Sequence, residues 1–405
     1  MKTSVLIVVS SLAMGGPQKS LVALLHRLRP EKFDVELVVL NASLDDLGDS
    51  LPDWVRITRA PSLVRTATIP RGVSLLELAG LARALGTLPS LALLGEVAWQ
   101  RMRGRPRTQI RQIVWRRSAP YLPRLDSVYD VAIGVLGLST YAVVDLVAAR
   151  RKYHWVRSDS RMLHRDEGIE NSYFAQLDGA IAVSPQVRAV FEDMYPSLAG
   201  RVQVYKNDTV GSLFDDGGGA EWSSESRAVR VLTVARLDPL KGIDLAIEAC
   251  SLLVSRGREI EWLVLGEGPE RQALERLANE RGLKDHFRLV GTVRDVNKYL
   301  REATVVVHPS RAEGRSNAVE EARAAEKAIV ATCYPTVVDQ VTDGVDGLVC
   351  GMNASSIALA IERVVDEPGL GERLGSCAGE RHRRERGDPN VLFGSLARGL
   401  VEGSV

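Results

Sequence analysis

The feature that most constrains the fold is a repeated alternation of short apolar runs with longer amphipathic stretches. Such runs are typical of buried parallel strands, and the stretches between them have the spacing of surface helices. The pattern predicts an α/β fold with two doubly wound, Rossmann-like domains. In the first half we expect strands at 4–9, 35–40, 129–136, 153–157, 179–184 and 201–206, and helices at 17–28, 139–149 and 185–194. In the second half we expect strands near 229–236, 261–266, 287–291, 304–308, 328–332 and 346–350.

A change in composition indicates where the two domains are joined. Residues 208–228 contain three consecutive glycines with clustered Ser and Asp, which is typical of a linker. The expected domains are therefore 1–207 and 229–385. The C-terminal segment 386–405 could cross back to the N-terminal domain. Because ligands of such folds bind outside the carboxyl ends of the strands, we expect a site in an interdomain cleft that the two domains face.

Charge and targeting patterns exclude several classes of protein. Lys and Arg total 52 against 51 Asp and Glu, so the chain is neither a globally basic nucleic-acid coat nor an acidic disordered chain. The N-terminal apolar run Val5–Val9 is too short for a signal peptide or a membrane span. The four cysteines show no C-x-x-C spacing, and we expect them to be free, buried thiols. Together these features predict a cytoplasmic protein.

The sharpest local pattern runs from His308 to Glu321. Glu313 lies in the loop after an expected strand, and Glu321 lies about one turn past Asn317 on the helix that follows. Exposed N–H groups near Ser316 and Asn317 would bind a phosphate, and a carboxylate one turn beyond suits a ribose diol. The alternative is that Glu313 is a solvated loop carboxylate and Glu321 an ordinary helix carboxylate.

Two further groups of residues follow expected strands. Arg236 closes a strand and Lys241, followed by Gly242, precedes the next helix; two cations there suit a diphosphate leaving group, the alternative being solvated loop charges. Gly15 and Gly16 follow the first strand, where glycine permits close backbone approach to a ligand and Gly16 can cap the helix. The pattern is not G-x-G-x-x-G, which argues against a nicotinamide or flavin dinucleotide site.

Together these motifs resemble the family 4 retaining glycosyltransferases, which have the GT-B fold. The resemblance rests on the E-x7-E pattern of Glu313 and Glu321, the Arg-x4-Lys-Gly element that begins at Arg236, and the N-terminal Gly-Gly loop. It extends over nearly the whole chain except about 45–125. Supporting fragments are Gly179–Ser184, Val204–Asn207, Gly266–Pro269 and Gly291–Asp295.

The resemblance implies a hexosyltransferase that uses a nucleoside-diphosphate sugar, UDP- or GDP-linked, held by the C-terminal domain. Transfer would retain the anomeric configuration and need no metal or other cofactor. The sequence contains no Asp-x-Asp, the metal–diphosphate motif of the other major glycosyltransferase fold.

The resemblance also implies roles for individual residues. Glu321 would bind the donor ribose, and Glu313 would lie near the donor sugar. Arg236 and Lys241 would neutralise the diphosphate, while the backbone at 291–295 would border the base. The implied catalytic residues are Glu313, Arg236, Lys241 and Arg157. The implied donor-binding residues are Gly16, Gly291, Val293, Arg294, Gly314, Ser316, Asn317 and Glu321.

One fragment departs from the family. Where members often carry a His after a strand of the first domain, this chain has Arg157. His154 lies three residues earlier and would point to the opposite face of the strand, so we interpret it as structural, although it remains a candidate beside the acceptor. We expect Arg157 and Asp159 to line the acceptor side of the cleft.

An Arg-rich segment at 97–124 interrupts the first domain. It has no acidic residue, and Trp99 and Trp115 interleave with its cations. Such a segment suits contact with anionic lipid headgroups, or equally a lipid-diphosphate acceptor; the alternative is a solvated loop and helix. We expect no nucleic-acid partner, because no binding motif accompanies the charge. The arginines are Arg101, Arg103, Arg105, Arg107, Arg111, Arg116, Arg117 and Arg124.

These observations lead to one functional hypothesis with two alternatives. The chain is expected to glycosylate a carbohydrate, lipid-linked or small-molecule acceptor in bacterial surface polysaccharide assembly, in the cytoplasm or at the inner face of the membrane. Residues 327–340 are similar to exopolysaccharide and capsule members of the family. The alternatives are a glycosyltransferase of a soluble natural product and a catalytically inactive GT-B-like binding protein, the latter suggested by Arg157.

Overall fold

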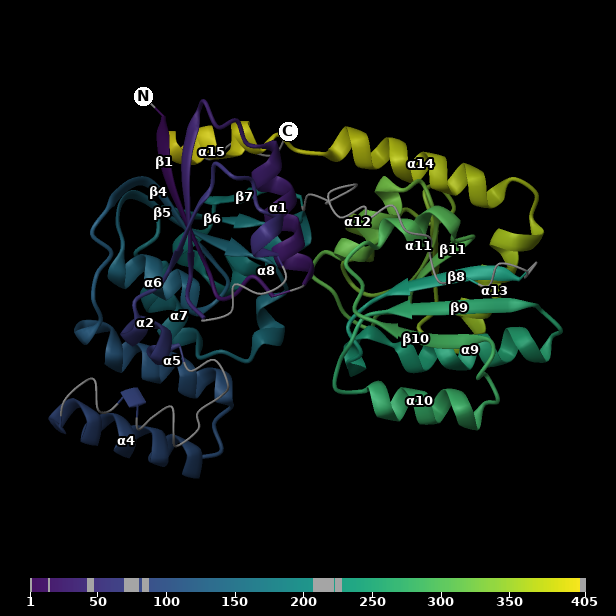
Figure 1. Ribbon diagram of the computed structural model, residues 1–405, viewed down its shortest axis with the longest axis horizontal. Coiled ribbons are helices and arrows are strands. Elements are labelled where there is room, and N and C mark those ends of the chain that lie inside the picture. Colours follow the sequence, from purple (N-terminus) through teal and green to yellow (C-terminus); the bar gives the residue numbers. More distant parts are fainter. Residues whose placement is uncertain are drawn as a thin grey trace. The chain divides into compact units, whose positions relative to one another are not determined.

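The computed structural model describes residues 2–13, 15–41, 47–68, 80–81, 87–206, 222 and 228–400. The chain divides into two compact units (Figure 1). Unit 1 comprises Met1–Lys206 and Gly387–Val405, and unit 2 comprises Asn207–Arg386. Most of the expected linker at 208–228 lies outside the described residues.

Unit 1 is built on a seven-stranded sheet with the order β3-β2-β1-β4-β5-β6-β7, in which every pairing is parallel. Its strands are β1 (Thr3–Val9), β2 (Phe33–Val39), β3 (Arg56–Arg59), β4 (Val128–Val135), β5 (Ala148–Val156), β6 (Gly179–Ala182) and β7 (Val202–Val204). Its helices are α1 (Gly16–Arg27), α2 (Ser62–Ala67), α4 (Thr87–Met102), α5 (Arg107–Ser118), α6 (Leu138–Leu146), α7 (Glu167–Phe174), α8 (Pro185–Met194) and α15 (Pro389–Arg398).

The C-terminal helix α15 packs on unit 1, far from its neighbours in sequence. Tyr153 on β5 donates its hydroxyl to the carbonyl oxygen of Leu396 at 2.8 Å. The ring of Phe393 packs edge-on against Phe33, with centroids 6.0 Å apart. The chain therefore returns to its first unit after completing the second.

Unit 2 is built on a six-stranded parallel sheet with the order β10-β9-β8-β11-β12-β13. Its strands are β8 (Val229–Val234), β9 (Ile260–Leu265), β10 (Phe287–Gly291), β11 (Val305–His308), β12 (Ala328–Thr332) and β13 (Leu348–Cys350). Its helices are α9 (Ile243–Ser255), α10 (Arg271–Glu280), α11 (Asn297–Glu302), α12 (Asn317–Ala324), α13 (Ala354–Asp366) and α14 (Leu370–Glu385).

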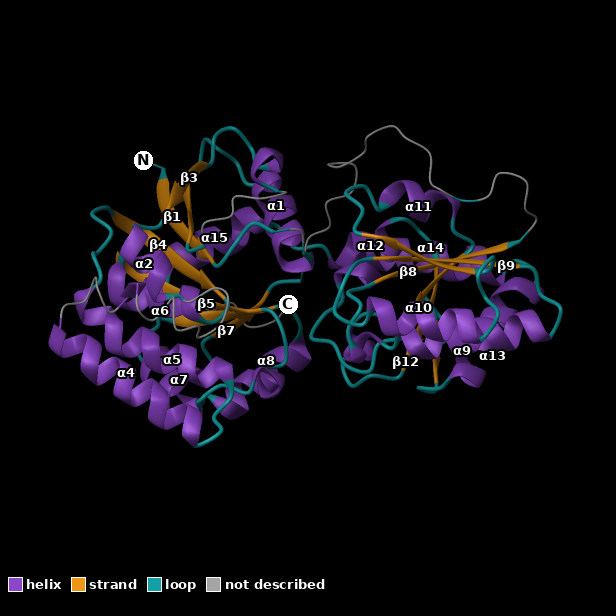
Figure 2. Ribbon diagram, turned by 60° about the horizontal axis from the view of Figure 1, so that its bottom comes forward, coloured by secondary structure: helices purple, strands orange, loops and turns teal. Residues whose placement is uncertain are grey.

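Helices cover both faces of this sheet, which explains the continuous apolar runs of its strands (Figure 2). Successive side chains on a strand point to opposite faces. On β9, Trp262 and Val264 accordingly enter the core beneath α9, α10 and α13, whereas Leu263 and Leu265 enter the core beneath α11 and α12. A strand buried on both faces cannot show polar alternation, and its sequence is therefore read as an unbroken apolar run.

The expected α/β architecture is confirmed, although α2, α4, α5, α7 and α15 were not among the expected helices and two strands of unit 1 differ from the expectation. The edge strand β3 was not predicted, because all four of its residues are exposed and its sequence, Arg-Ile-Thr-Arg, contains no apolar run. The helix expected at 139–149 ends at Leu146, and β5 already begins at Ala148. The Ala-Ala-Arg-Arg-Lys start of β5 is largely exposed, so it lacks the apolar pattern of a buried strand.

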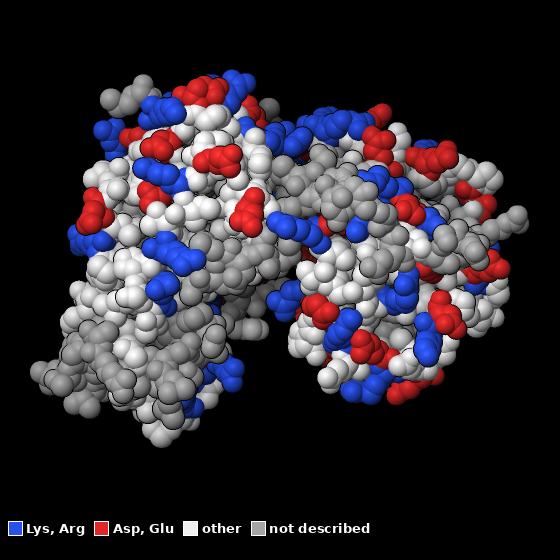
Figure 3. Space-filling view, viewed as in Figure 1, with Lys and Arg blue, Asp and Glu red and all other residues white. Residues whose placement is uncertain are grey.

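The Arg-rich segment forms the end of α4, then α5 and a short turn. In Figure 3 the charged side chains visible at the lower end of unit 1 are basic. Several of these arginines are nevertheless held within the unit. Arg105 pairs with Asp166 at 2.8 Å, and Arg111 donates to the Thr68 carbonyl oxygen at 2.9 Å.

Two further observations concern targeting and cysteines. Within the part of the chain that the structure describes, no helix is both long and apolar enough to cross a bilayer. All four cysteines are free, but only Cys250 is fully buried, and Cys333 is exposed. The expectation of buried thiols is therefore confirmed for Cys250, met only in part by the half-buried Cys350 and Cys377, and wrong for Cys333, which lies one residue past the carboxyl end of β12.

Candidate active site

The candidate site lies at the carboxyl edge of the unit 2 sheet, where β8 and β11 are neighbours. The strand order reverses at this pair, and open α/β sheets bind ligands at such a switch point. The loop after β8 carries Arg236 and Lys241, and the loop after β11 carries Glu313. The strand order therefore brings residues of two sequence motifs to one edge.

The two loops approach each other closely at Gly242. This residue has φ 64°, and a Cβ atom there would lie 2.0 Å from the carbonyl oxygen of Pro309. Only glycine fits both the backbone conformation and the space. Arg311, from the same loop as Pro309, donates to Asp244 at 2.6 Å and fastens the loops together. Lys241 is thereby held against the loop after β11.

The centre of the site is the carboxylate of Glu313. Its Oε1 atom accepts hydrogen bonds from Lys241 Nζ at 2.7 Å, Ser310 Oγ at 2.8 Å and His308 Nε2 at 3.0 Å. The backbone is fixed as well, since Thr336 Oγ1 donates to the Glu313 carbonyl oxygen at 2.9 Å. All three side-chain donors reach the same oxygen, which leaves Oε2 as the atom able to accept from a ligand.

The charge of Glu313 is set by competing effects. Burial by itself raises the pKa of a carboxyl group, because it disfavours the charged form. His308 and Lys241 outweigh burial and lower the pKa of Glu313 to about 2. The group is therefore a fixed negative charge at neutral pH rather than a general acid.

This pKa predicts how stability depends on pH. Because the pKa of Glu313 falls from 4.5 to about 2 on folding, its contribution is full above pH 4.5 and is lost as the pH falls towards 2. The difference in unfolding free energy between the wild type and Glu313→Gln is therefore expected to be constant above about pH 5 and to shrink below pH 4.5. Urea unfolding at several pH values measures it, and a difference that stays constant down to pH 3 would contradict the assignment.

The start of α12 differs from the expectation. Ser316 caps this helix by accepting the Val319 N–H at 3.4 Å, and its own N–H donates to Gln340 Oε1 at 2.7 Å. The Ser316 N–H is thus committed inside the protein and is not available to a phosphate, because the amide of Gln340 occupies it. Gly314 is buried just before this start, and Asn317 is the half-buried first residue of the helix.

Two consecutive carboxylates on α12 have different surroundings. Glu320 is buried and contacts Arg315 at 2.6 Å, Arg323 at 2.9 Å and His382 at 3.1 Å. Burial raises the pKa of Glu320, but Arg315, His382 and Arg323 together hold it below its ordinary value. Glu321, the second residue of the E-x7-E pattern, is the next residue of α12 and is 8% exposed. Glu320 braces the helix, and Glu321 remains the candidate for ligand binding.

The remaining donor-side candidates lie along the same edge. Arg236 is 71% exposed at its side chain, and its Nε lies 3.2 Å from Asp238. Gly291 ends β10 with φ 97°, followed by the half-buried Val293 and the exposed Arg294. These residues therefore lie at the same carboxyl edge of the sheet as the Lys241–Glu313 pair. Among the described contacts, none joins Arg236 to Glu313.

In unit 1 the expected Gly-Gly loop and Arg157 come together. Gly15 is the N-cap of α1, so the cap lies one residue before the expected Gly16. Arg157 follows β5 and donates Nη2 to the carbonyl oxygen of Pro17 at 3.3 Å. Its guanidinium also lies 5.2 Å from the ring centroid of Trp155. Arg157 is therefore positioned at the start of α1.

The two acceptor-side candidates have partners of their own. Asp159 caps a short turn and pairs with Arg161 at 2.6 Å; the hydrogen bond from Arg161 lowers the pKa of Asp159 despite partial burial. His154 is buried against the rings of Phe174 and Phe191, and burial lowers its pKa to about 3. His154 is therefore a neutral packing residue of the core, which a ligand does not reach.

Sequence reasoning missed two residues that orient Glu313. His308 and Ser310 both donate to its carboxylate, yet neither was assigned a role. Their position could have suggested one, since both lie at the carboxyl end of an expected strand and within five residues of Glu313.

The region that contains this site is similar in sequence to known glycosyltransferases. Residues 220–381 match the family model described as "Glycosyl transferases group 1", and this range contains every unit 2 candidate. Alpha-D-kanosaminyltransferase of Streptomyces kanamyceticus is 32% identical over 151 residues, which is 36% of this chain and 39% of that protein. Lipopolysaccharide core biosynthesis glycosyltransferase LpsD of Rhizobium meliloti is 27% identical over 217 residues, 52% of this chain and 60% of that protein. The chain thus spans less than two thirds of the length of these relatives.

A solved structure extends the likeness in fold to the whole chain. A variant of S. aureus TarM, in complex with fondaparinux, alpha-GlcNAc-glycerol and UDP, superposes with a TM-score of 0.69 at 12% identity and covers 98% of this chain and 99% of that one. The protein therefore has the GT-B fold, as predicted. The match to the group 1 glycosyl transferase model, at residues 220–381, lies within unit 2.

Proposed function

We propose that this chain is a retaining glycosyltransferase that moves a sugar from a UDP- or GDP-linked donor to an acceptor hydroxyl. The observation that carries the proposal is the Lys241–Glu313 pair at the switch point of unit 2, within the region that matches group 1 glycosyl transferases. A carboxylate that is 11% exposed and an ammonium group 2.7 Å away supply opposite charges at one place. Transfer from a nucleotide sugar needs both, because the anomeric carbon becomes positive as the diphosphate becomes negative.

The proposed step breaks the bond between the anomeric carbon and the diphosphate oxygen, whose electron pair leaves with the nucleotide. The acceptor hydroxyl attacks from the same face, and its proton passes to the departing phosphate. Glu313 stabilises the positive charge through Oε2, and Lys241 keeps two N–H donors for the diphosphate beyond the one given to Glu313. Glu321 would bind the ribose diol.

The other candidates take supporting roles in this proposal. The exposed Arg236 would add positive charge at the diphosphate, and the backbone near Gly291 would border the base. The roles of Gly16, Arg157 and Asp159 on unit 1 remain those that the family resemblance implies. Since cations of the chain neutralise the leaving group, the proposal includes no metal, and added chelator should leave the rate unchanged.

We propose a surface saccharide, lipid-linked during assembly in the cytoplasm, as the acceptor. The name of LpsD refers to lipopolysaccharide core biosynthesis, which supports this class. The name of the kanosaminyltransferase instead describes transfer of a kanosaminyl group, which supports the alternative of a soluble natural product.

Nucleotide release distinguishes the enzyme from an inactive binding protein. UDP and GDP are first screened by thermal shift, since a ligand of the native state raises its apparent stability. The matching nucleotide sugars are then incubated with the protein, and free nucleoside diphosphate is measured with and without chelator. The proposal predicts release in both cases, whereas a protein that is stabilised by the nucleotide but releases none is the inactive binder.

A specific observation on α4 supports a second proposal, contact with an anionic membrane surface. Trp99 is 46% exposed and Met102 is 79% exposed, and the neighbouring Arg101 and Arg103 are exposed as well. Apolar side chains beside arginines are the composition of interfacial helices, in which each cation near an anionic surface contributes about 1 kcal/mol.

Vesicle co-sedimentation tests this contact. The double variant Trp99→Ala/Met102→Ala is expected to bind anionic vesicles at least tenfold more weakly than the wild type, because both apolar anchors are lost. Val391→Ala, on an exposed residue of α15, is the matched control. Equal binding of the wild type to neutral and anionic vesicles at low salt would contradict the proposed attraction between the arginines and the anionic headgroups.

A further inference from the structure

Unit 1 contains a pocket that none of the roles above uses. Its volume is about 120 Å³. On the same measure, a cavity that holds a single water molecule needs about 10–15 Å³. The pocket therefore has room for a tetrahedral anion and part of the group that carries it. It is lined by Ser10, Thr108, Arg111, Gln112, Leu136, Gly137, Leu138, Tyr141 and Arg165.

The position of the pocket is that of a ligand site. Ser10 follows β1, and Leu136 and Gly137 follow β4, so the pocket lies at the carboxyl ends of these neighbouring strands. The order of the sheet reverses at the β1–β4 pair, which makes this the switch point of unit 1. Gly137 is also the N-cap of α6, whose positive dipole end adds to the potential in the pocket.

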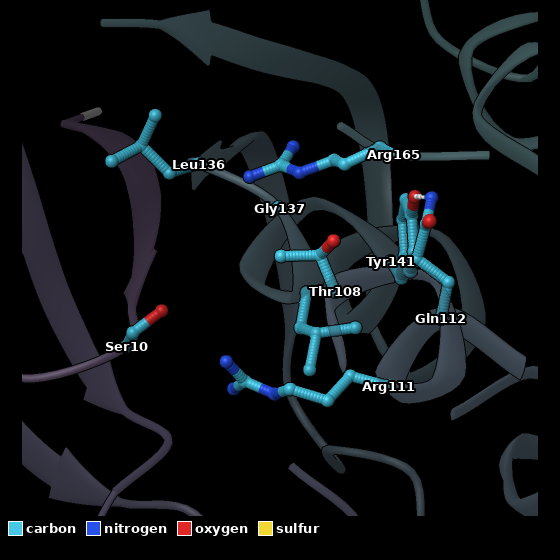
Figure 4. A pocket seen from close by; sticks show the side chains of 9 residues that line it. Ser10, Thr108, Arg111, Gln112, Leu136, Gly137, Tyr141 and Arg165 are labelled. Atoms are coloured by element: carbon cyan, nitrogen blue, oxygen red, sulfur yellow. Dashed lines mark hydrogen bonds between the residues drawn. The ribbon is translucent and has the colours of Figure 1, made fainter. Parts of the chain in front are cut away.

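Both charged side chains in the lining are arginines. Figure 4 shows Arg111 and Arg165 extending from different sides towards the part of the pocket where Ser10 lies. No carboxylate is among the lining residues, which are all described by the structure. Ser10 and Thr108 add hydroxyl groups, so the polar lining is dominated by hydrogen-bond donors.

Arg165 is held in place by a buried carboxylate behind it. Its Nη1 lies 2.9 Å from Oε1 of Glu170, which is only 2% exposed at its side chain. Glu170 also accepts hydrogen bonds from the hydroxyl groups of Tyr195 and Tyr141. On the other side, a Cβ atom at Gly137 would lie 2.8 Å from Arg165 Nη2, so glycine is what allows the guanidinium to lie there.

Arg111 and the neighbouring lining residues Gln112 and Tyr141 are also held by contacts within unit 1. Arg111 donates Nε and Nη2 to the Thr68 carbonyl oxygen at 3.2 and 2.9 Å. Gln112, one residue on, donates to Tyr141 Oη at 2.8 Å, and the ring of Tyr141 is stacked on Tyr173 at 4.0 Å. Both arginines that line the pocket are therefore anchored, and guanidinium N–H groups are preferred donors to phosphate and carboxylate oxygens.

We propose that this pocket binds a phosphate group of the acceptor through Arg111 and Arg165. The part that assigns the phosphate to the acceptor rests on the proposed function, whereas binding of the anion does not. The phosphate could belong to a soluble sugar phosphate or to a lipid phosphate. In either case the pocket would orient the acceptor and select against uncharged ones.

The experiment measures binding of three probes by calorimetry: inorganic phosphate, glucose 6-phosphate and geranyl phosphate. Arg111→Gln and Arg165→Lys are expected to weaken binding at least tenfold, the latter while keeping a cation beside Glu170 so that the unit remains folded. Arg107→Gln is the matched control, because Arg107 is an exposed arginine on the same helix that does not line the pocket. Tighter binding of glucose 6-phosphate indicates a soluble acceptor, and tighter binding of geranyl phosphate a lipid-linked one.

Two results would overturn the inference: no binding of any probe to the wild type, or binding that both pocket variants retain at full strength. UDP binding to the same variants separates this inference from the proposed function, since Arg111→Gln should bind UDP as the wild type does. If the probes bind but no nucleotide sugar is ever turned over, the proposed function fails while the anion pocket stands.

Discussion

Replacing Glu313 by Gln is expected to lower the rate of sugar transfer by about 10²–10³-fold, the usual effect of removing one preorganised electrostatic group. Gln keeps the shape of the side chain but not its charge, so the positive anomeric carbon loses its fixed partner. Lys241, His308 and Ser310 already hold the Glu313 carboxylate in place before any substrate arrives, which is why the loss should be large. Steady-state kinetics with saturating donor measures it.

The control for this variant must carry the same chemical change elsewhere in unit 2. Glu302→Gln is suitable, because Glu302 ends α11 just before β11 begins and so lies at the opposite edge of the sheet. Thermal unfolding of both variants shows whether the site remains folded. A folded Glu313→Gln protein that transfers sugar at the wild-type rate would remove Glu313 from the mechanism.

The neighbouring carboxylates Glu320 and Glu321 are expected to give opposite results. Glu320→Gln should destabilise the protein by about 3–5 kcal/mol, because it leaves the buried Arg315 and Arg323 without their main counter-charge. This corresponds to a fall in the melting temperature of roughly 10 °C. Glu321→Gln leaves the contacts of Glu320 with Arg315, Arg323 and His382 in place, so it should destabilise the protein by less than Glu320→Gln does.

Donor binding reverses the order of the two variants. Loss of charge-assisted hydrogen bonds to the ribose is expected to weaken UDP or GDP binding to Glu321→Gln by about 10–100-fold. The folded fraction of Glu320→Gln should bind the nucleotide with nearly wild-type affinity. Calorimetric titration beside thermal unfolding tests the pair, and each variant serves as the control for the other. Equal nucleotide affinity of Glu321→Gln and the wild type would refute the ribose assignment.

The sequence predicted the sheets well because their strands are buried on both faces. All six strands of unit 2 contain apolar runs that enter two cores, and each was expected near its observed position. The edge strand β3 escaped prediction because nothing covers its residues, so its Arg-Ile-Thr-Arg sequence carries no burial pattern.

The candidate site was predicted in parts rather than as a whole. Lys241 and Glu313 were each identified from their motifs, but they are 72 residues apart, and only the β8–β11 pairing makes them neighbours. Arg111 was noted only as part of the Arg-rich segment and Arg165 was not singled out, although the structure brings both to one pocket from α5 and from the loop before α7. Local sequence spacing does not determine which distant strands become neighbours in a sheet. The pairing of these charged side chains therefore follows only from the structure.

Proton NMR of a reaction between the protein, a nucleotide sugar and an acceptor hydroxyl determines the stereochemistry of transfer. We expect nucleoside diphosphate to appear together with a glycoside whose anomeric configuration equals that of the donor. A product of inverted configuration would contradict the proposed same-face attack. Absence of both nucleotide release and product across UDP- and GDP-sugars would contradict the assignment of a glycosyltransferase.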